Sequence, residues 1–173
     1  GYSEHPVGVG EGDAARERTV AAVSPSFFRF YDVQPVIGRF ILASDDTPPV
    51  GAAVAVLTWD FWQSEFGGRN VVGEELQVGD VRAEIIGVAP RGLRGLDDFR
   101  PPSLFIPAAT LGSARGLSSA AVQSFYRYHP WNSVVTLVRR RPGVSLEAAE
   151  AEVTRVTHAS WETERVSRQI NMF

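Results

Sequence analysis

Two adjacent pairs of carboxylates, Asp45-Asp46 and Asp97-Asp98, are the residues of this chain whose types could do chemistry. Paired acids can bind a hard cation or serve as the acid and base of a hydrolase. An inverting pair of carboxyl groups would have to converge within about 10 Å. Neighbouring side chains on a loop usually point apart, and Asp is common in turns because it hydrogen-bonds nearby backbone. The sequence therefore favours turn roles for these acids and keeps a hydrolase as an alternative.

The remaining reactive residue types give no second constellation. His5, His129 and His158 lie far apart, and none stands at a metal-ligand spacing from another histidine. The chain has no cysteine, which excludes thiolate catalysis, disulfides and zinc–thiolate sites. Lysine is absent too, which excludes a Walker-type phosphate loop. We therefore expect no catalytic residue, no metal, no cofactor and no enzymatic activity.

Composition limits the classes of protein further. With 173 residues and 44% hydrophobic content, the chain can build the core of one domain or of two small subdomains. A net charge of −3 argues against a nucleic-acid partner, because binding to phosphates needs clustered positive charge. No apolar run approaches the roughly 18 to 20 residues that cross a bilayer. The chain opens with Gly-Tyr and reads as an excised piece of a larger protein, so this says little about its parent.

The stretch VLTWDFWQSEFGG, residues 56–68, is the densest aromatic feature. Thr58 is a good N-cap, and the two closing glycines suit a helix C-terminus. Trp59, Trp62 and Phe66 are spaced three and four apart, which places them on one stripe of a helix. Exposed rings could form a ligand platform, whereas buried rings would anchor the helix on a sheet. We favour the core and expect Trp59 and Trp62 to be mostly buried.

The elements around this helix indicate a mixed α+β fold. Apolar runs and alternating patterns predict strands, and turn formers separate them. We expect a hairpin within residues 1–23, a short helix over 25–31, strands over 52–57 and 103–109, a hairpin over 74–90, and a closing strand over 133–140 that precedes a helix from 146 to about 164. Strands and helices alternate too irregularly for a doubly wound sheet.

Several motifs taken together resemble a known family. In order along the chain they are VSPSFFRFYDVQPVIGRF, VAVLTWDFWQSEFGG, VVGEELQVGD, IIGVAPRGLRGL and LFIPAA, with a closing WNSVVTLVRRRPGVSLEAAEAEVTRV. The set is similar to the periplasmic core domain of MacB-like ABC transporter permeases, and closest to the branch of duplicated orphan permeases. The likeness is dense over residues 20–110. Residues 1–18 and 111–130 carry little of it.

The resemblance implies a discontinuous domain organisation outside the cytoplasmic membrane. Residues 1–32 plus 130–173 would form a porter-like α/β-sandwich subdomain, and residues 33–129 an inserted, sabre-like α+β subdomain. The resemblance also implies partners, namely the transmembrane helices of the permease and an ABC ATPase. A periplasmic adaptor protein is a further candidate partner, but family members differ in their accessory proteins, so the resemblance does not identify one. Such a domain transmits conformational change between the two copies of a dimeric parent. We expect the isolated chain to be a monomer.

A different function remains open beside this one. The chain could be a periplasmic module that binds a lipophilic or peptide ligand at the junction of the two subdomains. Its contacts would be exposed apolar side chains of the loop RGLRGLDDF, namely Leu93, Leu96 and Phe99. Burial of these side chains would argue against this alternative.

Overall fold

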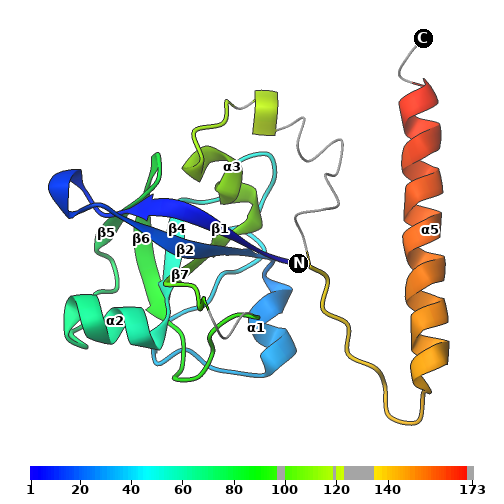
Figure 1. Cartoon of the computed structure of the whole chain (residues 1–173), viewed down its shortest axis with the longest axis horizontal. Coiled ribbons are helices and arrows are strands. Elements are labelled where there is room, and N and C mark those ends of the chain that lie inside the picture. The colour runs from blue at the N-terminus through cyan, green and yellow to red at the C-terminus, as the bar shows by residue number, and fades with distance from the viewer. Residues whose placement is uncertain (97–99, 119, 123–134, 171–173) are drawn as a thin grey trace. The chain divides into compact units, whose positions relative to one another are not determined.

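A computed structural model gives the structure of the chain. It describes residues 1–96, 100–118, 120–122 and 135–170, with side chains described as far as residue 159. The chain divides into two compact units, Gly1–Leu137 and Val138–Phe173 (Figure 1). None of the described helices is long and apolar enough to cross a membrane.

The first unit contains most of the secondary structure. Its strands are β1 (Tyr2–Val9), β2 (Arg16–Val23), β3 (Ile37–Gly38), β4 (Val54–Leu57), β5 (Glu75–Val78), β6 (Val81–Val88) and β7 (Leu104–Pro107). Its helices are α1 (Ser26–Tyr31), α2 (Trp59–Phe66) and α3 (Leu111–Ala114), with 3-10 turns η1 (Gly12–Ala14) and η2 (Ala108–Thr110). The second unit contains α5 (Leu146–Ile170). The mixed α+β class predicted from the sequence is confirmed.

The seven strands form one sheet in the order β3-β6-β4-β7-β2-β1-β5, and β5 also pairs with β6. The strands from β6 to β5 in this order therefore form a closed ring, and β3 pairs with β6 outside it. The hairpins β1–β2 and β5–β6 are antiparallel, as predicted, whereas β2 runs parallel to β7 and β4 parallel to β6. In the first hairpin, Pro6 lies opposite Thr19 and Gly8 opposite Glu17. Pro6, Thr19 and Glu17 line a hollow over this hairpin.

Both faces of the sheet carry a hydrophobic core. On β2, Val20 and Ala22 pack in a cluster with α2 and α3, while Ala21 and Val23 pack in a second cluster with α1. Alternate residues of a strand point to opposite faces, so a strand covered on both sides needs apolar residues throughout. This explains the uninterrupted apolar run of β4, Val54–Leu57, every residue of which is buried.

Helix α2 buries its aromatic side chains only in part. Trp62 and Phe61 are 6% and 8% exposed, whereas Trp59 is half-buried at the edge of the same cluster. The prediction for Trp62 is confirmed, and Trp59 is less buried than expected, because the core-facing side of the helix includes Phe61. Thr58 precedes the helix as predicted, but its hydroxyl donates to the carbonyl of Ser103 at 2.9 Å rather than capping the helix.

The end of the chain departs from the predicted strand and helix. Of the predicted strand over 133–140, the described residues show a single bridge, Tyr2 to Val135, with two backbone hydrogen bonds of 2.9 and 2.7 Å. The prediction of a continuous strand is therefore wrong over 136–140. Helix α5 begins where predicted, and the backbone N–H of Ala148 donates to Ser145 Oγ at 3.2 Å, so Ser145 caps the start of the helix.

Apolar side chains of α5 are solvent-exposed. Leu146, Val153 and Val156 are exposed by 60%, 41% and 54%. The predicted division into a subdomain of residues 1–32 plus 130–173 and one of residues 33–129 stays a prediction. Within the first unit, β1 and β2 pair in the same sheet as the strands that follow residue 33.

Candidate functional site

Asp45, the first of the candidate acids, is held in a structural role. Its side chain is buried and accepts hydrogen bonds from Arg39 Nη1 at 2.5 Å, Arg39 Nη2 at 3.2 Å and the Leu42 backbone N–H at 2.8 Å. Burial favours the neutral acid, but the Arg39 and Leu42 hydrogen bonds outweigh it and lower the pKa of Asp45. A carboxylate so fully engaged fixes the loop between β3 and β4.

Asp46 serves a different element. Its carboxylate accepts the backbone N–H of Ala109, at the start of η2, at 2.7 Å. Burial raises the pKa of Asp46, although this hydrogen bond opposes the rise. The two carboxylates thus bind separate parts of the fold, as expected for turn acids, and do not form a catalytic pair. Asp97 and Asp98 lie outside the described residues.

The histidines also fail to form a site. In the part of the chain that is described, no group of three or more His, Asp or Glu side chains could hold a metal ion. His5 is half-buried, and its Nε2 is buried without a hydrogen-bond partner among those residues. Burial, and then the charge of Arg115, lowers the pKa of His5. His158 is exposed on α5, and His129 lies outside the described residues.

The loop after β6 corrects one of the predicted ligand contacts. Leu93 is only 8% exposed and packs in the core cluster on the α1 side of the sheet, so it is not available to a ligand. Burial of this apolar side chain in the core lowers the free energy of the folded chain relative to its exposure to water. Leu96 is 40% exposed, and its role as a contact stays a prediction. Phe99 lies outside the described residues.

Tyr2 ties this loop to β1. Its hydroxyl donates to Glu4 and accepts the backbone N–H of Leu96 at 3.2 Å. Burial and the neighbouring Glu4 carboxylate raise the pKa of Tyr2 well above its ordinary range. Gly95 has φ +81°, and a Cβ there would collide with the Tyr2 hydroxyl. The close approach of loop and strand therefore requires glycine at this position.

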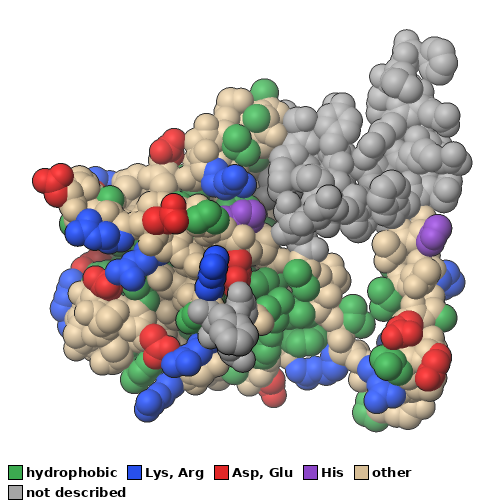
Figure 2. Space-filling model, in the orientation of Figure 1, with side chains coloured by type: hydrophobic (Ala, Val, Ile, Leu, Met, Phe, Trp, Pro, Cys, Tyr) green, Lys and Arg blue, Asp and Glu red, His purple; other side chains and the backbone are tan. Residues whose placement is uncertain are grey.

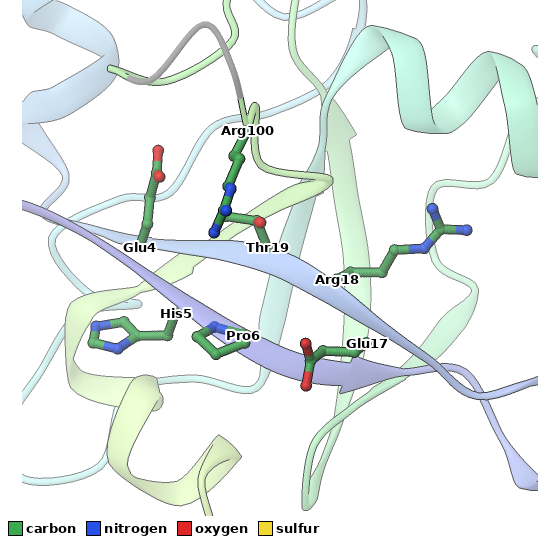
Figure 3. Close-up of a pocket in the computed structure, with 7 residues that line it drawn as sticks. All are labelled: Glu4, His5, Pro6, Glu17, Arg18, Thr19 and Arg100. Atoms are coloured by element: carbon green, nitrogen blue, oxygen red, sulfur yellow. The ribbon is translucent and has the colours of Figure 1, made fainter.

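Two adjoining hollows open beside this loop. The larger, of about 510 Å³, lies over the β1–β2 hairpin (Figure 3). It is lined by Glu4, His5, Pro6, Glu17, Arg18, Thr19 and Arg100. The smaller, of about 290 Å³, lies at the start of α2. It is lined by Arg18, Thr58, Asp60, Phe61, Ser64, Arg94, Pro101, Pro102 and Ser103. We call the two hollows together the hairpin groove, and Arg18 is their common wall.

Charged side chains of both signs line the hairpin groove. Arg18 pairs with Glu65 at 2.7 Å and lies over the Phe61 ring, 5.5 Å from its centroid. Arg94 pairs with Asp60 at 2.8 Å. Figure 2 shows basic and acidic side chains interspersed over this side of the first unit. The groove was not foreseen in the sequence, because its residues come from distant segments with no shared motif.

Comparison with known proteins gives the family. Residues 2–156 match the family described as the MacB-like periplasmic core domain. The chain belongs to this family. None of the curated proteins compared with the chain matches it.

Solved structures agree with this assignment. The periplasmic region of MacB from Actinobacillus actinomycetemcomitans is 13% identical, with a TM-score of 0.60 over 91% of this chain and 65% of that one. A domain of a putative permease protein from Porphyromonas gingivalis is 16% identical, with a TM-score of 0.54 over 91% and 62%. The extracellular domain of the ABC-type transporter YknZ from Gram-positive bacteria is 14% identical, with a TM-score of 0.53 over 66% and 56%.

The match confirms the family that the motifs resemble. It makes the chain a MacB-like periplasmic core domain of the kind carried by ABC transporter permeases, and such domains lie outside the cytoplasm. The chain spans between 56% and 65% of the length of the three structures named above. The fold class predicted from the sequence is shared with these structures.

Proposed function

We propose that the chain is a non-enzymatic, extracytoplasmic domain of an ABC transporter permease that transmits movement and contacts partner proteins. The family match over residues 2–156 carries this proposal. A transmitting domain must move as a unit, so its strands should be coupled. A seven-stranded sheet that closes on itself and is packed on both faces supports this requirement.

The two candidate acids that the structure describes support a role without catalysis. Asp45 and Asp46 hold backbone and side-chain partners on separate elements, and neither points with the other into a common cleft. The proposed partners are the transmembrane helices of the parent permease, an ABC ATPase and a periplasmic adaptor. The parent would be a dimer, and the isolated chain a monomer.

Cysteine labelling in whole cells tests the location. The chain has no cysteine of its own, so Asp13→Cys in the exposed η1 turn gives one label site in this domain. In a parent permease freed of other cysteines, a membrane-impermeant maleimide should label Asp13→Cys in cells whose inner membrane is intact. Labelling only after the inner membrane is disrupted would refute an extracytoplasmic domain.

A further inference from the structure

The hairpin groove contains an acid and a base, Glu17 and Arg100, that pair with none of the residues described in this structure. Arg18 and Arg94 each form an ion pair with a carboxylate, and Glu4 accepts a hydrogen bond from the Tyr2 hydroxyl. Glu17 and Arg100, in contrast, have no hydrogen bond or ion pair with any other described residue. Both are exposed. An opposite-charge pair that lines a hollow without internal partners is free to meet charges on a ligand.

The floor of the groove is a strand surface whose side chains are exposed or half-buried among the described residues. Glu4, Pro6, Glu17 and Thr19 alternate with the core-facing residues of the hairpin, so their side chains stand on its outer face. Helix α1 packs on this face near Tyr2, whose ring stacks on that of Phe27 with the ring centroids 5.2 Å apart. Figure 3 shows the Arg100 side chain reaching from its loop toward Thr19, with Glu4 beside it.

The walls of the groove are preorganised. Pro6, Pro101 and Pro102 restrict the backbone on both sides, and Arg18 is held by Glu65 and by the Phe61 ring. Rigid walls reduce the ordering cost of binding. The two hollows share Arg18 and are lined by charged, polar and apolar side chains together, a chemistry that suits a polypeptide better than a compact apolar molecule.

We propose that the hairpin groove binds an extended peptide segment of a partner protein, one that carries an acidic and a basic side chain on the same face. The acid pairs with Arg100 and the base pairs with Glu17. Side chains two positions apart in an extended segment share a face, so the motif is acid-x-base or base-x-acid. The inference rests on the proposed role in protein contacts and adds the surface and the chemistry of the partner.

Titration of the isolated chain with capped pentapeptides tests the proposal. The probes are acetyl-Ser-Glu-Ser-Lys-Ser-amide, its order-reversed form with Lys first, and the uncharged acetyl-penta-serine amide. Amide chemical shifts in two-dimensional nuclear magnetic resonance spectra report where each peptide binds. We expect at least one charged peptide to shift amides of Gly8 and Thr19 with millimolar affinity, and the uncharged peptide to bind at least about fivefold more weakly.

Charge-neutralising variants locate the contacts. Arg100→Gln and Glu17→Gln should each weaken binding about three- to fivefold. Glu75→Gln is the matched control, because Glu75 is an exposed β-strand acid that pairs with Arg82 away from the groove. The affinity of the Glu75→Gln variant for the charged peptides should equal that of the wild type. Spectra of the free variants verify that each retains the fold.

Two results would overturn the proposal. One is the absence of shifts at the hairpin with either charged peptide at about 10 mM. The other is binding that Arg100→Gln and Glu17→Gln leave unchanged, since the charges of the groove would then play no part. Either failure leaves the transmission role standing, because that role is tested in the whole transporter rather than with the isolated chain.

Discussion

Replacing Asp45 by Asn should destabilise the first unit by about 2 kcal/mol. The Asp45 carboxylate is 10% exposed and accepts three hydrogen bonds, two of them from Arg39. Arg39 is 44% exposed, so solvent screens its ion pair with Asp45. After the substitution, water can take over part of the hydrogen bonding that Arg39 loses. We assign about 1 kcal/mol to the Arg39 pair and about 1 kcal/mol to the weakened contact with Leu42.

The pH dependence of this effect has a defined sign. The pKa of Asp45 is lowered in the folded state, so below its ordinary value, about 3.9, the unfolded chain takes up the proton first. The stabilisation is therefore present above about pH 4 and is lost as the pH falls through the folded-state pKa. The difference in unfolding free energy between wild type and Asp45→Asn should be constant from about pH 5 to 7 and shrink below about pH 4.

Urea unfolding followed by tryptophan fluorescence measures these differences. Arg39→Gln, and the double variant with Asp45→Asn, complete a thermodynamic cycle whose coupling energy should be about 1 kcal/mol. The urea m-value should not change, because the surface exposed on unfolding is the same. A cost of under about 0.5 kcal/mol for Asp45→Asn, or strict additivity with Arg39→Gln, would refute the assignment.

Three further predictions concern the core and the groove. Trp62→Ala should cost about 3 to 5 kcal/mol in urea unfolding, because the ring is 6% exposed and its Nε1–H donates to the backbone carbonyl of Arg69 at 2.7 Å; a cost of under about 1 kcal/mol would contradict its place in the core. Leu93→Ala should cost about 2 to 4 kcal/mol and Leu96→Ala less than about 0.5 kcal/mol; equal costs would show that the two side chains are buried alike. The pKa of His5 is lowered, so the unfolded chain gains the proton first and stability should fall as the pH drops from about 7 toward 5. His5→Gln should remove this part of the pH dependence, and an unchanged profile would rule His5 out as its source.

Local chemistry made much of the fold predictable. The apolar run of β4 and the glycine-containing hairpin of β5–β6 are read from a few neighbouring residues, and the structure contains both. The helix α2 was predictable for the same reason. Its orientation was predicted less well, because a spacing of three and four favours Trp59 and Trp62, while the packing of Phe61 depends on side chains from distant strands.

Long-range pairing explains what the sequence did not reveal. Residues 136–140 have the alternation of a strand, but alternation does not specify a partner strand, and among the described residues of this stretch Val135 alone forms a bridge. Glu17 and Arg100 line the same hollow, although they are far apart in the sequence and belong to no motif. Leu93 and Leu96 look alike in sequence, and only the packing of the loop against Tyr2 separates a buried leucine from an exposed one.

Distance measurement between the two copies of this domain in the parent transporter tests the central claim most directly. A nitroxide attached at Asp13→Cys reports the separation of the exposed η1 turns by pulsed electron paramagnetic resonance. Transmission of movement predicts that the distance distribution shifts between the nucleotide-free and ATP-bound transporter, and that it returns after hydrolysis. An identical distribution in all three states, in a transporter with active ATPase, would contradict the proposed role.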